Sequence, residues 1–281
     1  MRYFIKEDDI EQELIDVCMN ELHYDHHFDC MNIDHLHRKN EVEVLNLDVL
    51  RQAIRSVNNE ATDRPQGMTD AEVEQAIDAI RASDLNVDGH ILNQRILTTI
   101  ISGCRMQVLQ SNGHKELRTV HYIDWKEGNA DNNQFDVINQ LWIQGQVYRL
   151  RPDVIVYING IPLVTIELKD SNIPVREAYD NNLTRYKAAI PQIMAYNAFL
   201  VASNATKTRL GSTFADWTYF SPWFRASEDE KADKEQLEAD KTTLDAMARS
   251  LLKKENLLNY IANYILFYKG TNKICAKNHQ F

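Results

Sequence analysis

Residues 151–170 read Arg-Pro-Asp-Val-Ile-Val-Tyr-Ile-Asn-Gly-Ile-Pro-Leu-Val-Thr-Ile-Glu-Leu-Lys-Asp. The β-branched and aromatic residues on either side of Asn159-Gly160 predict two strands joined by a tight turn. Asp153 stands at the head of the first strand, and Glu167 and Lys169 lie at the end of the second. Two acids and a lysine on one hairpin can hold a divalent cation beside a phosphate, which indicates a metal-dependent nuclease.

The chemistry of phosphodiester cleavage assigns a role to each of these residues. Carboxylates are the ligands that magnesium prefers, so Asp153 and Glu167 are candidate metal ligands, and the carbonyl of Leu168 is a third. Lys169 lies two residues after Glu167, so both side chains point to one face of the strand. A lysine there can orient the attacking water and stabilise charge on the phosphate. An isolated Glu-x-Lys is usually a surface ion pair, but this one interrupts a run that is apolar on both faces.

The register of the hairpin decides whether the two acids can meet. A strict two-residue loop at Asn159-Gly160 would pair Asp153 with Ile166. Asp153 would then lie on the face opposite to Glu167, whereas shared metal binding needs both on the same face. We therefore predict an odd offset in the hairpin, either a bulge at the glycine of the turn or a kink near Pro162.

The rest of the chain predicts an α/β fold. Helical periodicity predicts helices over residues 7–22, 47–57, 69–82, 91–109, 175–188, 191–196 and 244–268. Runs rich in β-branched and aromatic residues predict strands over residues 119–125, 134–143, 147–158, 161–168 and 198–203. Thr69 precedes Glu72 at the spacing of a capping box. Residues 23–40 are polar and histidine-rich, and we expect a loop there.

Composition limits the classes of function. The chain has 281 residues and a net charge of −10, which argues against a protein that grips nucleic acid over its whole surface. No apolar run reaches the roughly 18 residues of a membrane span, and the N-terminus lacks the apolar core of a secretory signal. The four cysteines are far apart and form no C-x-x-C pair. We expect a cytoplasmic protein with reduced thiols and no membrane partner.

Short motifs spread over residues 10–225 form one specific pattern when taken together. They are Ile123-Asp124-Trp125, residues 133–140, Arg151-Pro152-Asp153, Asn159-Gly160, Glu167-Leu168-Lys169, Tyr186-Lys187, residues 190–193, Tyr196-Asn197, Ser203-Asn204, Gly211-Ser212 and Trp223. The pattern resembles the nuclease domain of the motor (R) subunits of type I restriction enzymes. This resemblance implies a PD-(D/E)xK core, in which a mixed central β-sheet is flanked by helices, with extra N-terminal helices.

The resemblance also implies site residues. Asp153, Glu167 and Lys169 match the catalytic signature of that core. An acid on the first helix is expected to join the metal site, and Glu11 best occupies its place. Glu13 is a rival, although two residues along a helix turn a side chain by about 200°.

A Q-x-x-x-Y element is also expected. Gln192 and Tyr196 fit it literally, while Asn182 and Tyr186 fit it in the helix that follows the hairpin, and the sequence does not choose between them. Arg151 joins these four as a residue that binds DNA or supports the site.

The function implied is that of a magnesium-dependent endonuclease domain acting on double-stranded DNA. Residues 1–225 would be the endonuclease domain, with a helical part over 1–112 and a sheet core over 117–225. Residues 226–281 would be a helical linker to a helicase motor, because residues 273–281 resemble the run into that motor's adenine-reading glutamine. No G-x-x-x-x-G-K-[ST] occurs, so ATP would bind only in the full-length motor.

The expected partners, besides DNA, are the modification and specificity subunits of a restriction complex. Two alternatives stay open. One is a catalytically silent, nuclease-like docking module, and the other is a repair or recombination nuclease with the same core.

Overall fold

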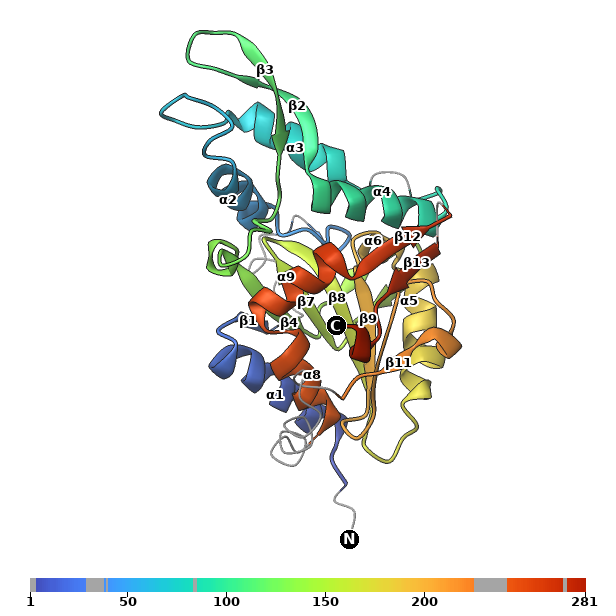
Figure 1. Ribbon diagram of the computed structural model, residues 1–281. Coiled ribbons are helices and arrows are strands. Elements are labelled where there is room, and N and C mark those ends of the chain that lie inside the picture. Colours follow the sequence, from blue (N-terminus) through green and yellow to red (C-terminus); the bar gives the residue numbers. More distant parts are fainter. Residues whose placement is uncertain (1–3, 29–37, 39, 83–84, 225–241, 270–271) are drawn as a thin grey trace.

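The computed structural model describes residues 4–28, 38, 40–82, 85–224, 242–269 and 272–281. A seven-stranded sheet lies at its centre, in the strand order β1-β4-β7-β8-β9-β10-β11 (Figure 1). The strands are β1 (Asp25–Phe28), β4 (Phe135–Asn139), β7 (Val154–Ile158), β8 (Ile161–Leu168), β9 (Phe199–Ser203), β10 (Thr208–Gly211) and β11 (Ser221–Pro222). β1 runs parallel to β4 and β8 runs parallel to β9, whereas the other neighbours are antiparallel. The predicted mixed sheet is confirmed.

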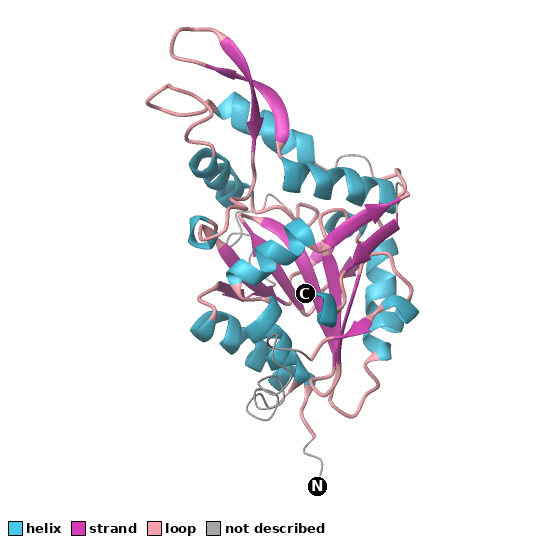
Figure 2. Ribbon diagram, in the orientation of Figure 1, coloured by secondary structure: helices cyan, strands magenta, loops and turns pink. Residues whose placement is uncertain are grey.

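Helices surround this sheet (Figure 2). They are α1 (Glu7–Asp16), continued by the π-helical η1 (Val17–Glu21), then η4 (Ala178–Leu183), α5 (Thr184–Ala189), α6 (Pro191–Met194), α8 (Thr243–Leu251) and α9 (Lys254–Asn263). Every residue of β4, β7, β8 and β9 is buried. Because these strands are covered on both faces, they read as continuous apolar runs instead of alternating ones.

A second group of elements projects from one end of the body (Figure 1). It consists of α2 (Leu47–Val57), α3 (Asp70–Ile80), α4 (Gly89–Ser102) and the hairpin of β2 (Cys104–Leu109) and β3 (Lys115–Val120). Side chains cap all three helices, namely Asn46 for α2, Thr69 in the predicted capping box with Glu72 for α3, and Asp88 for α4. These caps satisfy backbone N–H groups that a helix start leaves free.

The predicted helix over residues 91–109 is wrong beyond Ser102. Gly103 has φ +79, and an added Cβ there would lie 2.8 Å from the carbonyl oxygen of Val120. The glycine therefore ends α4 and turns the chain directly into β2. Buried Met106 and Val108 alternate with exposed neighbours along β2, which is the period of a strand.

Several other boundaries differ from the prediction. The expected loop over 23–40 contains β1, and 29–37 with 39 lie outside the described residues. The expected strand over 119–125 is instead Lys115–Val120. The strands expected over 134–143 and 147–158 each break into two pieces, since Ile143–Gln144 (β5) and Arg149–Leu150 (β6) pair with one another apart from the main sheet. The helix expected over 244–268 splits into α8 and α9 and ends before β12 (Ile265–Tyr268), which pairs with β13 (Asn272–Cys275).

One hydrophobic cluster connects the chain from α1 to the last strands. It includes Ile10 of α1, Ile54 of α2, Val156 of β7 and Leu251 of α8. The C-terminal helices therefore pack on the same core as the central sheet. The predicted domain boundary at residue 225 falls in a stretch outside the described residues, so the division into two parts stays a prediction. Among the described residues, no helix has the length and apolar character needed to cross a membrane.

Candidate active site

The β7–β8 hairpin contains the predicted offset. Asn159 and Gly160 form its two-residue turn with φ values of 51° and 78°. Tyr157 pairs with Pro162, but the next residue back, Val156, pairs with Val164. Leu163 is thus an extra residue in β8, a β-bulge directly after Pro162 and not at the glycine of the turn.

The bulge brings the two acids to one face. Beyond it Val154 pairs with Ile166, so the next position along the ladder sets Asp153 opposite Glu167. Asp153 is 6% exposed and Glu167 is fully buried. The backbone N–H of Leu168 donates to Asp153 Oδ2 at 2.7 Å, which fixes the Asp153 carboxylate beside the end of β8.

Glu167 is held by one group on each oxygen. The Tyr186 hydroxyl donates to Oε2 at 2.9 Å, and the Lys169 ammonium donates to Oε1 at 3.3 Å. Lys169 Nζ also donates to the carbonyl of Leu168 at 2.5 Å and lies 3.5 Å from Glu7 Oε2. The Leu168 carbonyl, predicted as a metal ligand, is therefore engaged by the lysine in this structure.

The two acids carry raised pKa values. Burial raises the pKa of Asp153 to about 6, and the charges of Glu7 and Glu11 raise it as well. The hydrogen bond from the N–H of Leu168 acts in the opposite direction and lowers this pKa. Burial and the charge of Asp153 raise the pKa of Glu167 well above its ordinary value. Burial alone would lower the pKa of Lys169, but the charges of Glu167, Asp153 and Glu7 outweigh burial and raise it. Two buried acids beside one lysine leave negative charge that a cation would offset.

Glu11 reaches this site from α1. Its Oε1 accepts from Asn139 Nδ2 at 2.7 Å, and its Oε2 accepts from Gln140 Nε2. The same nitrogen of Gln140 lies 3.5 Å from Asp153 Oδ1, so one amide links the two carboxylates. Sequence reasoning missed Asn139 and Gln140, although both lie in the segment 133–140 that carries part of the resemblance. It also missed Glu7, one helical turn before Glu11, where the spacing of four residues was the available signal.

The structure places only one of the two Q-x-x-x-Y candidates at the site. Tyr186 contacts Glu167, and Asn182 hydrogen-bonds Tyr186 from the π-helical turn before it. Tyr196 instead accepts from the backbone N–H of Ala82 at 3.0 Å. Gln192 donates to the backbone carbonyl of Gln144 at 2.8 Å. Gln192 and Tyr196 are buried residues of the scaffold, whereas Tyr186 contacts Glu167 directly and Asn182 contacts Tyr186.

Arg151 lies next to the site with its side chain exposed. Its backbone carbonyl accepts from the Tyr186 hydroxyl at 3.4 Å, and its guanidinium stands 5.2 Å from the ring centre of Trp142. A guanidinium over an aromatic face makes a cation–π contact and keeps its N–H donors available to a phosphate. Arg151 therefore suits contact with a ligand outside the carboxylate cluster better than contact with the acids.

The donor set suits magnesium. Among the described residues, no group of three or more His, Cys, Asp or Glu side chains is arranged so that it could hold a metal ion. Magnesium does not need one, because it keeps several waters and binds through one or two carboxylates. Asp153 and Glu167 could supply those carboxylates, and the amide of Gln140 links Glu11 to Asp153.

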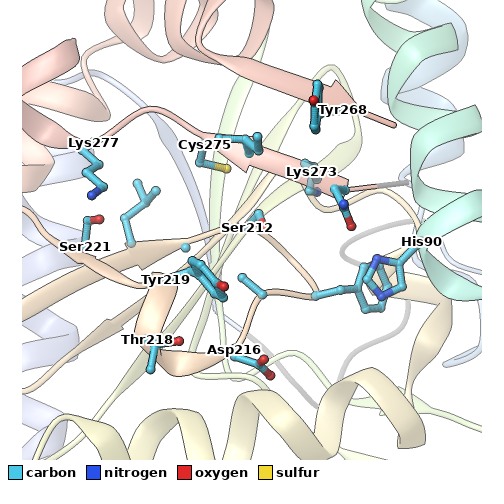
Figure 3. Close-up of a pocket in the computed structure, with 16 residues that line it drawn as sticks. His90, Ser212, Asp216, Thr218, Tyr219, Ser221, Tyr268, Lys273, Cys275 and Lys277 are labelled. Atoms are coloured by element: carbon cyan, nitrogen blue, oxygen red, sulfur yellow. The ribbon is translucent and has the colours of Figure 1, made fainter. Parts of the chain in front are cut away.

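A cavity of about 480 Å³ lies elsewhere, between the loop after β10, the start of α4 and the β12–β13 hairpin (Figure 3). None of the predicted site residues lines it. Of the described residues that do, Asp216 is the only acid. Lys273 at its wall donates to the backbone carbonyl of Asn197 at 2.7 Å. The cavity lacks the paired acids that the hairpin has, so we place the candidate active site at the hairpin.

Residues 4–219 match the family model described as type I restriction enzyme R protein N terminus. The chain belongs to this family. That match contains α1, the complete β7–β8 hairpin and α5, so every residue assigned above to the site lies within it.

Named restriction enzyme subunits are among the relatives of this chain. The chain is 31% identical over 248 residues to the type I restriction enzyme HindI endonuclease subunit of Haemophilus influenzae, covering 85% of this chain and 22% of that protein. It is 32% identical over 217 residues to the putative type I restriction enzyme MjaIXP endonuclease subunit of Methanocaldococcus jannaschii, covering 70% of this chain and 20% of that protein. The chain thus spans about a fifth of the length of these relatives, and their names support an enzyme of the nuclease type.

Proposed function

We propose that this chain is the magnesium-dependent DNA endonuclease domain of a type I restriction enzyme R subunit. The observation that carries the proposal is the bulge at Leu163, which sets Asp153 opposite Glu167 at the end of β8. A regular two-residue hairpin would separate these carboxylates onto opposite faces. Family membership supports the reaction class, and the paired acids with Lys169 support the metal-assisted route.

The chain's own residues divide the work. Asp153 and Glu167 would hold magnesium with Glu11 nearby, and the ion would neutralise charge developing on the phosphate. The N–H of Leu168 fixes Asp153, and the hydroxyl of Tyr186 fixes Glu167.

Lys169 completes this arrangement. Its ammonium lies beside Glu167 and would orient the attacking water and stabilise the oxyanion. Arg151, exposed at the entrance to β7, would contact a phosphate of double-stranded DNA.

ATP binding and translocation are proposed for the whole enzyme and not for this chain. This chain matches only about a fifth of the length of each relative, and we infer that ATP binding and ATP-driven translocation occur in the further length. The net charge of −10 makes this chain a weak DNA binder by itself. Modification and specificity subunits would therefore bring the DNA to this domain in the cytoplasm.

Substitution of Lys169 tests the proposal. Lys169→Ala in the full R subunit, assembled with its modification and specificity subunits, should lower the rate of plasmid cleavage by at least ~100-fold. Circular dichroism should show the parental fold. Lys207→Ala removes an exposed lysine near the end of β9 and should cut normally. Normal cleavage by Lys169→Ala would refute the role of this lysine.

Magnesium titration separates the nuclease from the silent docking module. A docking module has no need for an ion held by acids, so it should show no binding that depends on Asp153 or Glu167. The proposal instead requires that binding disappear when either acid is replaced by its amide.

A further inference from the structure

The backbone of Gln140 has an unusual conformation next to the candidate site. β4 ends at Asn139, and Gln140 follows with φ +55, a left-handed value that is uncommon for a residue with a Cβ. Its N–H donates to the backbone carbonyl of Asp153 at 2.8 Å, which ties the end of β4 to the start of β7. Left-handed residues other than glycine persist only where the surroundings determine them, and they gather at functional sites.

This conformation directs the side chain of Gln140 between two acids. Its Nε2 donates to Glu11 Oε2 and lies 3.5 Å from Asp153 Oδ1. An amide nitrogen has two hydrogens, so one Gln140 side chain can address both carboxylates at once. Because both neighbours are acceptors, the nitrogen faces them, and Gln140 acts as a donor to the acids and not as a metal ligand.

A second amide from the same strand end completes the hold on Glu11. Asn139 Nδ2 donates to Glu11 Oε1 at 2.7 Å. His26 Nε2 stands 3.0 Å from Asn139 Oδ1, which fixes the orientation of that amide. Both oxygens of Glu11 are thus gripped by consecutive residues of one strand end, and each oxygen keeps a further lone pair.

We propose that Gln140 is a positioning residue that holds the Glu11 and Asp153 carboxylates in register for a divalent ion. This inference rests on the proposed function. Without an ion the two acids repel each other, and the shared amide offsets that repulsion in the metal-free site. Groups that orient metal ligands in this way commonly change metal affinity ~10- to 100-fold when they are removed.

Shortening Gln140 by one methylene group tests the inference. Asparagine tolerates the left-handed conformation, so Gln140→Asn keeps the backbone while its amide no longer reaches both acids. We expect the dissociation constant of Mn²⁺ for the 281-residue chain, measured by electron paramagnetic resonance, to rise at least ~10-fold, while circular dichroism shows the parental fold. Gln140→Gly should show the same loss, since it also suits the backbone and carries no amide.

Gln134→Asn is the matched control. Gln134 precedes the other end of β4, is also half-buried, and donates to a carboxylate, Asp136, at 2.9 Å. The same chemical change there should leave Mn²⁺ affinity within about two-fold of the parent. Gln140 acts partly through Glu11, so the effects of the two substitutions should overlap. The double variant Glu11→Gln/Gln140→Asn should therefore lose less Mn²⁺ binding free energy than the sum of the losses in the two single variants.

Asp153→Asn distinguishes failure of this inference from failure of the proposed function. Unchanged Mn²⁺ binding by Asp153→Asn would overturn the proposed function, whatever Gln140 does. If Asp153→Asn abolishes binding while Gln140→Asn and Gln140→Gly bind like the parent, only the positioning role of Gln140 is overturned.

Discussion

Tyr186 and Tyr196 are both buried tyrosines, but their hydroxyls contact chemically different groups. The hydroxyl of Tyr186 meets the carboxylate of Glu167 at 2.9 Å, and that of Tyr196 meets the backbone N–H of Ala82 at 3.0 Å. A hydrogen bond to a buried charge is worth more than one between neutral groups, because the charge has lost its water. The two residues should therefore respond differently to loss of their oxygen atoms.

Phenylalanine substitutions separate the two tyrosines. Tyr186→Phe should slow plasmid cleavage by the assembled enzyme about 10-fold or more, since Glu167 loses its Oε2 donor. Tyr196→Phe should cut at the parental rate while losing about 1 kcal/mol in the free energy of unfolding, measured with urea. The reverse pattern, with Tyr196→Phe inactive and Tyr186→Phe normal, would return the Q-x-x-x-Y role to Gln192 and Tyr196.

Some residues of the candidate site could be predicted from the sequence, and others could not. Asp153, Glu167 and Lys169 lie within twenty residues on one predicted hairpin, so strand geometry together with the requirement for shared metal binding predicted how they meet. Gln140 was not predicted because its role depends on a left-handed turn at a strand end and on α1 packing beside that end. Alternation and periodicity carry no signal for either feature.

At the scale of elements, the requirement that two acids share one metal ion predicted the irregular register of the β7–β8 hairpin. Metal sharing required an odd offset, and β8 has its extra residue at Leu163. The helices α2 and α3 were predicted because their apolar faces, and the Thr69 capping box of α3, are local in sequence. The strand β2 was missed because Ile100 and Ile101 prolong the apolar pattern of α4, while Gly103 alone carries the stop signal.

The turn glycines provide a prediction for the same hairpin. Gly160 and Gly113 both have positive φ, so alanine at either position costs about 1–2 kcal/mol of backbone strain. At Gly160 the new Cβ would also lie 2.4 Å from the carbonyl oxygen of Asn46, whereas at Gly113 nothing lies within 4 Å. Gly160→Ala should therefore lose at least ~1 kcal/mol more than Gly113→Ala in urea unfolding. Equal losses would show that the approach of Asn46 to the turn is not rigid.

At the scale of the whole molecule, the candidate site draws on widely separated parts of the chain. α1 supplies Glu7 and Glu11, the end of β4 supplies the two amides, and α5 supplies Tyr186. A single hydrophobic cluster holds these elements together. The proposed function therefore depends on one property of the folded chain, which is that Asp153 and Glu167 bind a single ion together.

A crystal structure of the chain soaked with Mn²⁺, with its anomalous density, tests that property most directly. We predict one ion bound by oxygens of both Asp153 and Glu167 near pH 7.5, at distances close to the ~2.1 Å typical of magnesium sites. Because burial raises the pKa of Glu167 and raises that of Asp153 to about 6, protons should compete with the ion for both carboxylates, and occupancy of the site should fall as the pH is lowered. Clear density in which the two carboxylates turn away from each other, with no ion between them near neutral pH, would contradict the account.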